Sequence, residues 1–191
     1  MPNWCENKMM VIGSLENLSK IYQDLNDLSL KDSKGFLEKY LPTPAELLNR
    51  DALFGEAEDS DEMKKKYGSA DWYWWRVDNW GTKWDLHDVY GINLNGNLED
   101  GKYQLCCNFE TAWAPPEEGI RKISEVFKDT YFYIEFNEPG MGFAGYYSCM
   151  NGEDVGSVTV ESYTKFDQVE YEPEYYFNMA KEITSPKTES E

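Results

Sequence analysis

The motif NWGTKWD, which begins at Asn79, gathers side chains that could hold a polar ligand. In a binding site, Trp80 and Trp84 would wall a pocket, because indole rings offer a large apolar face and one N–H donor. Lys83 and Asp85 would then orient the ligand, with the Asn79 amide as a further donor and acceptor. The structural alternative is a turn in which the asparagine satisfies local amides and both tryptophans fill the core. Both interpretations stay open at this stage.

Trp113 is a further candidate for the same ligand- or partner-binding site. It follows Glu110 and Thr111 at the end of the strongest predicted strand, and the loops after strand ends often hold functional residues. The structural alternative is a hydrophobic staple in front of the helix predicted at 116–128.

The candidate motif ends a longer aromatic stretch, DWYWWRVDNWGTKWD, at residues 71–85. It contains five of the seven tryptophans. A core seam, a ligand platform or an aromatic partner site could each use that density, and residue types alone do not choose among them.

The residues for catalysis or metal binding are few. His87 is the only histidine, so no site with several histidines can form, and we expect it to be a half-buried polar residue in a strand. The four cysteines show no C-x-x-C spacing and are expected to be reduced thiols. The sequence also lacks a P-loop, an H-E-x-x-H motif and a G-x-S-x-G motif. We therefore expect no metal, no cofactor and no enzymatic activity.

The charge of the chain bears on its partners. Thirty-six acidic against 18 basic residues give a net charge of −18, which repels nucleic-acid phosphates and anionic membranes and favours a basic protein partner. The first residues lack the features of a signal peptide, and no apolar run is long enough to span a bilayer. The sequence therefore predicts a cytoplasmic protein with a basic protein as partner, and it leaves the oligomeric state open.

The order of predicted elements indicates an α+β fold. Strands are predicted at 8–12, 84–93, 103–109 and 131–136, and helices after Ser14 and at 116–128. This order is typical of a ferredoxin-like split βαβ domain, in which two helices cover one face of a four-stranded antiparallel sheet. Asn151-Gly152 predicts a β-hairpin between 143–150 and 155–163, packed on the open face or added to an edge.

The domain is predicted to span residues 1–165. An acidic, solvated insertion near 49–69 interrupts it, and an acidic, partly disordered tail follows at 166–191. The dipeptides Asn95-Gly96 and Asp100-Gly101 predict turns around a short connection.

Four motifs occur in one order along the first 150 or so residues: MPNWCENKMMVIG at the start, NWGTKWD, FETAWAPP and NEPGMGFAGYY. Together they resemble the Api92-like family of phage and plasmid proteins, which includes YubB-like proteins. The resemblance implies a ferredoxin-like domain, a phage, plasmid or bacterial origin and a cytoplasmic location in a bacterial host. It implies no reaction and no catalytic residues.

Two functional hypotheses follow from the sequence. In the first, an acidic binding module docks on a basic host or phage protein, acting as a mimic of nucleic acid. In the second, an aromatic face of the sheet binds single-stranded nucleic acid or a small ligand by stacking, for which Arg76, Lys83 and Lys102 would supply the nearby positive charge. The net charge favours the first hypothesis.

Overall fold

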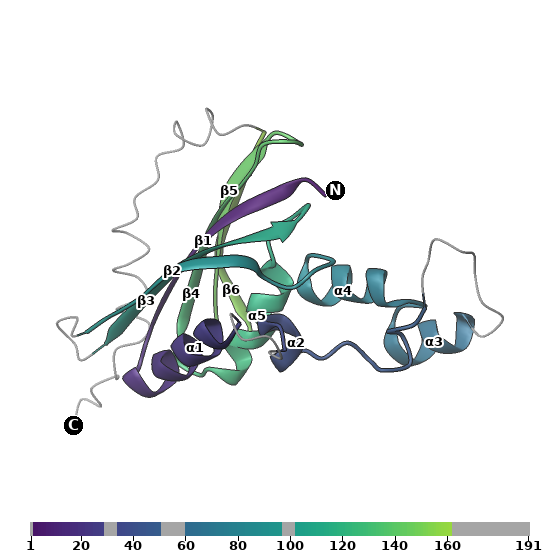
Figure 1. Cartoon of the computed structure of the whole chain (residues 1–191), viewed down its shortest axis with the longest axis horizontal. Helices are drawn as coiled ribbons and strands as arrows, with labels where there is room; N and C mark the ends of the chain where they lie inside the picture. Colours follow the sequence, from purple (N-terminus) through teal and green to yellow (C-terminus); the bar gives the residue numbers. More distant parts are fainter. Residues whose placement is uncertain (1, 29–33, 51–59, 97–101, 162–191) are drawn as a thin grey trace, which may run out of the picture.

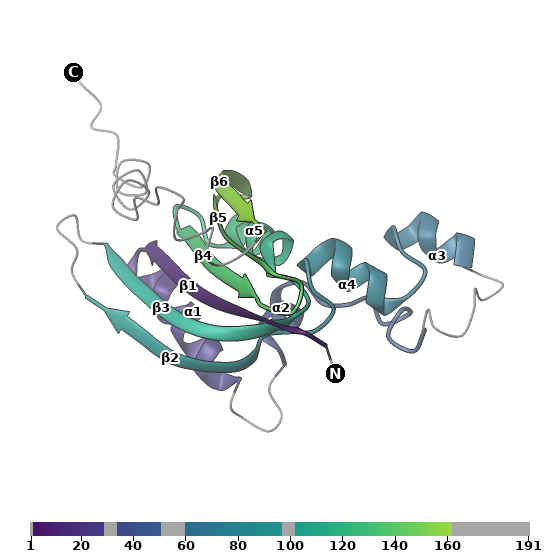
Figure 2. The same ribbon diagram turned by 90° about the horizontal axis from the view of Figure 1, so that it is seen from above.

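Six strands form one sheet in the order β2-β3-β1-β4-β5-β6, and every neighbouring pair is antiparallel. A computed structural model describes residues 2–28, 34–50, 60–96 and 102–161. The strands are β1 Trp4–Gly13, β2 His87–Asn95, β3 Tyr103–Ala112, β4 Tyr131–Glu138, β5 Phe143–Met150 and β6 Glu153–Val160 (Figures 1 and 2). The mixed helix and strand content and the antiparallel sheet agree with the sequence prediction.

Strand alternation separates the two faces of the sheet. On β1, Cys5, Met9 and Val11 are fully buried, whereas Glu6 and Lys8 between them are exposed. The adjacent cysteines of β3 point to opposite faces, so that Cys107 is buried and Cys106 is half-buried. All four cysteines are free thiols, which confirms the prediction.

Helices α1 Leu15–Asp27 and α5 Glu117–Val126 pack against one face of the sheet and bury their apolar stripes in the main core. Ser14 caps α1, because its hydroxyl accepts a hydrogen bond from the backbone N–H of Asn17. The buried apolar residues of α1 are Leu18, Ile21 and Leu25, whereas Leu15 and Tyr22 are exposed.

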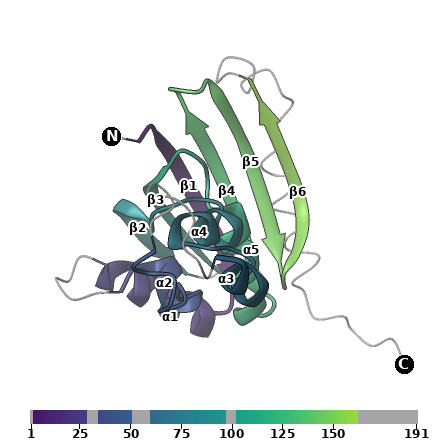
Figure 3. The same cartoon turned by 90° about the vertical axis from the view of Figure 1, so that its right-hand side faces the viewer.

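The aromatic stretch is a helix, α4 Trp72–Trp80, which the sequence analysis did not predict. Asp71 caps its first turn through the backbone N–H of Trp74, and Gly81 ends it in the left-handed conformation with φ of 83°. Two further helices, α2 Phe36–Tyr40 and α3 Ser60–Tyr67, precede it in the sequence. α3 and α4 extend away from one end of the sheet (Figures 1 and 2), and seen from that side they lie in front of it (Figure 3).

The predicted hairpin is present and extends the sheet at its edge, where β5 pairs with β4. Asn151 and Gly152, with φ of 56° and 86°, form the turn between β5 and β6. β6 ends at Val160, so the predicted strand end at Tyr163 lies outside the described residues. The same holds for the Asp100-Gly101 turn, for residues 51–59 of the acidic insertion and for the tail at 166–191.

Candidate functional site

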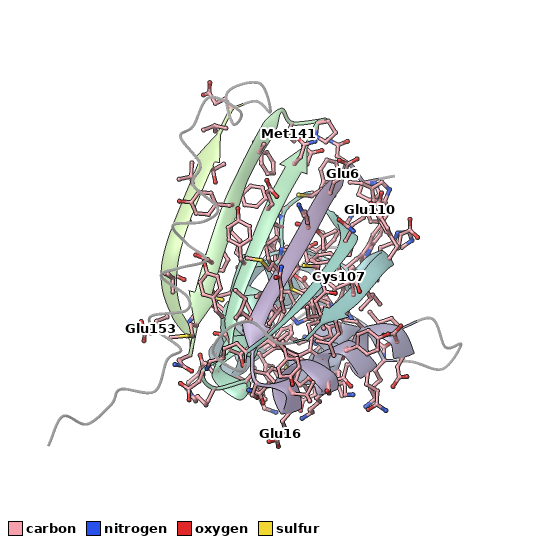
Figure 4. All side chains as sticks on the ribbon, turned by 90° about the vertical axis from the view of Figure 1, so that its left-hand side faces the viewer. Glu6, Glu16, Cys107, Glu110, Met141 and Glu153 are labelled. Atoms are coloured by element: carbon pink, nitrogen blue, oxygen red, sulfur yellow. The ribbon has the colours of Figure 1, made fainter. Side chains whose placement is uncertain are left out.

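The face of the sheet opposite α1 and α5 carries carboxylates on its central strands (Figure 4). Glu6 on β1 lies directly opposite Glu110 on β3, and Lys8 lies opposite Glu135 on β4. Residues in such cross-strand positions are near neighbours, and like charges there are destabilising. The Lys8 ammonium lies 3.9 Å from the Glu135 carboxylate, whereas Glu6 has no salt-bridge partner in the described part of the chain.

These side chains line a groove of about 400 Å³ on the open face of the sheet. We call it the sheet groove, and it is lined by Glu6, Asn7, Lys8, Tyr90, Asn108, Phe109, Glu110, Glu135, Phe136 and Asn137. Tyr90 on the edge strand β2 is 57% exposed, so one aromatic ring is accessible beside the carboxylates. The groove can therefore offer carboxylates and one ring to a ligand that carries positive charge.

An aromatic cluster adjoins the groove at its Glu110 side. Trp4 and His87 are stacked with ring centroids 4.7 Å apart, and Trp4 lies 5.8 Å from Trp84. The Nδ1 atom of His87 lies 3.6 Å from the Glu110 carboxylate. The prediction of a half-buried histidine is wrong, because His87 begins the edge strand β2 and leaves its side chain 60% exposed.

The Lys83 ammonium lies over three aromatic rings. Its Nζ is 4.5 Å from the ring centroid of Trp84 and 5.8 Å from those of Tyr73 and Trp113. All three distances are within the range of a cation–π contact. The structure thus brings three of the predicted site residues together, Lys83, Trp84 and Trp113.

The other predicted site residues, Asn79, Trp80 and Asp85, make contacts that hold the fold together in the described chain. Trp80 is fully buried and donates its indole N–H to the carbonyl of Leu41 at 3.0 Å, so it lies in the core and not opposite Trp84 in a pocket. Asn79 donates to the carbonyl of Trp75 and accepts from Lys122.

Asp85 is bound to backbone amides. Its carboxylate accepts hydrogen bonds from the backbone N–H groups of Leu37, Glu38 and Leu86. Burial raises the pKa of Asp85 above its ordinary value, although these three hydrogen bonds act to lower it. This carboxylate therefore holds the start of α2 and is not free to orient a ligand.

The sheet groove was missed by the sequence analysis. Its carboxylates Glu6, Glu110 and Glu135 alternate with buried residues along β1, β3 and β4, which is the pattern of a half-exposed strand. That alternation assigns each carboxylate to the open face, but the register that sets Glu6 against Glu110 cannot be read from the sequence of either strand.

A second cleft, of about 450 Å³, lies between the start of α5 and the β5–β6 hairpin. Glu117, Tyr147 and Asp154 line it together with Phe136 and Phe143. Burial and the neighbouring Asp154 raise the pKa of Glu117. Tyr147 donates its hydroxyl proton to Asp154 at 2.5 Å, and its pKa is raised by burial and by this hydrogen bond.

Residues 2–28, 34–50, 60–96 and 102–161 also bear on metal binding and on membrane insertion. No three or more histidine, cysteine, aspartate or glutamate side chains within these ranges are grouped so that they could hold a metal ion. None of the helices in the described part of the chain is long and apolar enough to cross a membrane.

Comparison with known proteins places the chain in a family. No curated protein matches the sequence. The crystal structure of a protein api92 from Yersinia pseudotuberculosis is similar over 84% of this chain and 98% of that chain, with 12% identity and a TM-score of 0.47. A family model described as a ferredoxin-like domain in Api92-like protein matches residues 79–178, a range that contains β2 to β6 and α5 but not β1. Because this match covers more than half of the 191 residues, the chain belongs to the family of Api92-like proteins and carries their ferredoxin-like domain.

Proposed function

We propose that this protein is a non-enzymatic binding module that docks on a basic segment of another protein through the sheet groove. The observation that carries the proposal is the cross-strand pair of Glu6 and Glu110, two carboxylates set against each other on the open face of the sheet. Like charges in this position oppose folding, and a bound lysine or arginine side chain would remove the repulsion.

Apart from Lys8, which lies 3.9 Å from the Glu135 carboxylate, the remaining residues of the groove fit the same ligand. Glu135 adds a third carboxylate, and the exposed ring of Tyr90 offers a face for a guanidinium or ammonium group. The net charge of −18 would attract a basic partner over distance and speed its association at low salt. If the basic segment normally binds phosphates, the protein would act there as a mimic of nucleic acid.

Binding of single-stranded nucleic acid is the second hypothesis, and the geometry favours it less. It needs positive charge beside the rings. Arg76 is instead engaged with Glu38 at 3.3 Å and with the hydroxyl of Thr43 at 2.9 Å. Lys83 lies over aromatic rings, and the carboxylates of the groove would repel a phosphate backbone.

The test compares two variants that lose the same charge. The groove variant carries Glu6→Gln, Glu110→Gln and Glu135→Gln, and the control variant carries Glu16→Gln, Asp61→Asn and Glu62→Gln at exposed positions on α1 and α3. The probe is a fluorescein-labelled arginine- and lysine-rich peptide, titrated by fluorescence anisotropy. We expect about a tenfold weaker affinity for the groove variant, from three charge pairs of modest strength.

The control variant should weaken binding far less, because its changes alter only the long-range field. Equal weakening in both variants would show that net charge alone attracts the peptide and that the groove is not a site. A single-stranded oligonucleotide that binds the unmodified protein more tightly than the peptide would favour the second hypothesis.

We also infer a finer description of the fold that supports this surface. The units β1-α1-β2 and β3-α5-β4 would be the two interleaved halves of a split βαβ domain. Their strand order β2-β3-β1-β4 and their antiparallel pairing support this inference. In that arrangement the surface left for a partner is the part of this face near the groove, because the rest of the face carries a second cluster of buried residues, Ile12, Tyr131, Tyr133, Ala144 and Tyr146.

A further inference from the structure

Among the described residues, the Lys83 ammonium has aromatic rings as its neighbours and no carboxylate at salt-bridge distance. Its contacts are to the rings of Tyr73, Trp84 and Trp113, and no salt bridge joins it to any acid in the described ranges. In a chain with 36 acidic residues against 18 basic ones, carboxylate partners are abundant. The three rings therefore form a site that holds an ammonium group by cation–π attraction, and we call them the aromatic cage.

Trp113 is held in a backbone conformation that a bulky residue rarely adopts. Its φ is 75°, in the left-handed region, and its backbone N–H donates to the carbonyl of Asn3 at 3.0 Å. The loop around it is fixed by Thr111, whose hydroxyl donates to the carbonyl of Ala114, and by Thr82, which donates to the carbonyl of Ala112. Such a conformation costs free energy and occurs preferentially at functional sites.

Burial of the Trp113 ring does not explain this strain. The residue remains 40% exposed, and Trp84 beside it is 38% exposed. A tryptophan that only filled the core would be buried as Trp80 is. The strained backbone thus serves to place an accessible ring against the Lys83 ammonium.

The aromatic cage is connected to the sheet groove. Trp84 contacts Trp4, Trp4 stacks on His87, and His87 adjoins Glu110 of the groove. One extended basic segment could therefore place one side chain among the carboxylates and another between the rings.

We propose that the aromatic cage binds a lysine, methylated lysine or arginine side chain of the partner, and that Lys83 occupies the cage until the partner displaces it. The proposal rests on the proposed function, because it assigns a second contact to the same basic segment. Lys83 already shows which chemical group fits between the rings. Its flexible side chain can turn out to solvent when a guest cation enters.

An anionic ligand held by Lys83 is the competing interpretation, and the two predict opposite effects of removing this lysine. If Lys83 blocks the cage, Lys83→Ala strengthens binding of a small cation. If Lys83 binds an anion, the same change leaves cation binding as it was and abolishes binding of the anion.

The probe is the N-acetyl amide of trimethyl-lysine, because a quaternary ammonium binds to aromatic cages without hydrogen bonds. Its neutral isostere, in which a carbon atom replaces the nitrogen, reports the apolar contribution alone. Binding is followed by the ¹⁵N–¹H signals of the seven indole groups, with those of Trp84 and Trp113 assigned from the Phe variants. We expect Lys83→Ala to bind the cation about two- to fivefold more tightly, in line with one cation–π contact at an exposed site.

Matched variants separate the cage from general effects. Lys128→Ala removes an exposed positive charge elsewhere and should leave the affinity unchanged. Trp113→Ala in the Lys83→Ala background should abolish binding, whereas Tyr22→Ala, which removes a 37% exposed ring on α1, should not.

Three outcomes would overturn the proposal: equal affinity for the cation and its neutral isostere, no gain from Lys83→Ala, or no shift of the Trp84 and Trp113 signals. The groove variant with Glu6→Gln, Glu110→Gln and Glu135→Gln should still bind the small cation. If the small cation does not bind the cage but the basic peptide still binds, the proposed function remains intact. If the cation binds the cage but the peptide does not bind the groove, the groove alone is rejected.

Discussion

The carboxylate of Asp85 accepts hydrogen bonds from three backbone N–H groups, at 3.0 Å for Leu37, 2.8 Å for Glu38 and 2.8 Å for Leu86. Two of them belong to the first turn of α2, so this side chain attaches a five-residue helix to the start of β2. A short helix has little stability of its own and depends on such contacts.

We expect Asp85→Ala to lower the free energy of unfolding by about 3 kcal/mol, because it leaves these donors without a partner. Asp85→Asn retains one acceptor oxygen and should lose less. Urea unfolding followed by circular dichroism measures both variants. An Asp85→Ala protein as stable as the unmodified one would mean that water reaches α2 and replaces the carboxylate.

Glu117 predicts a dependence of stability on pH. Burial and Asp154 raise its pKa in the folded protein above the ordinary value of 4.5, so the folded state binds the proton more tightly than the unfolded state. Ionisation of Glu117 therefore destabilises the fold fully above the folded-state pKa, and this penalty disappears as the pH falls below the unfolded-state value.

The expected result is that Glu117→Gln raises the melting temperature near neutral pH and loses this advantage as the pH falls to about 4. Differential scanning calorimetry of both proteins across this range tests it. Glu125→Gln, an exposed substitution on the same helix, is the control and should show no such trend. An advantage that stays constant with pH would assign the effect to packing.

For the site residues, the sequence predicted which side chains could take part in a site but not which contacts each of them makes. It brought Lys83, Trp84 and Trp113 into one candidate site, and the structure places them together. It could not separate Trp80 and Asp85 from them, because their partners Leu41 and Leu37 lie more than 35 residues earlier in the chain. The spacing of neighbouring residues in the sequence does not reveal contacts between segments that are so far apart along the chain.

Helix α4 shows why one element escaped prediction. Its tryptophans and tyrosine are common in strands, and its nine residues show no clear apolar stripe, since Trp80 is the one buried residue among them. The usable signals were its ends, an aspartate directly before Trp72 and a glycine directly after Trp80. By contrast, α1 and α5 were predicted because their buried residues recur at helical spacing.

We expect the N-terminal end of α4, which points away from the sheet, to fray easily. With little buried surface, it depends on the Asp71 cap, whose carboxylate accepts from the Trp74 N–H at 2.9 Å. We expect Asp71→Ala to cost about 1 kcal/mol of helix stability and to speed amide hydrogen exchange across the first turns of α4.

Ser14→Ala provides the matched control, because Ser14 caps α1 in the same way but α1 is held by a buried stripe. Exchange in α1 should change little in that variant. Equal acceleration in both helices would contradict the view that α4 has the weaker tertiary support.

For the whole molecule, local sequence patterns predicted the elements of the sheet but not how all of them pair. The strands, the two covering helices and the Asn151-Gly152 hairpin follow from period and turn chemistry. The place of the hairpin was left between the open face and an edge, and pairing of β5 with β4 places it at the edge. That choice depends on contacts between strands, as does the register that opposes Glu6 and Glu110.

The excess of negative charge predicts how the melting temperature and the affinity for a basic peptide depend on salt. With a net charge of −18, the folded protein repels itself, and added salt screens this repulsion. The melting temperature should therefore rise when sodium chloride increases from about 0.01 M to about 0.15 M. Affinity for a basic peptide should fall over the same range, because salt screens attraction as well as repulsion.

The groove variant distinguishes the local pair from the overall charge. Glu6→Gln, Glu110→Gln and Glu135→Gln together remove the opposed carboxylates, so the melting temperature at low salt should rise and its increase with salt should become smaller. The control variant at Glu16, Asp61 and Glu62 loses equal charge from exposed positions on α1 and α3, away from the sheet groove, and should show a smaller change of both kinds. If the two variants respond alike, the Glu6–Glu110 pair carries no special repulsion, and the reason for locating the partner in the sheet groove is lost.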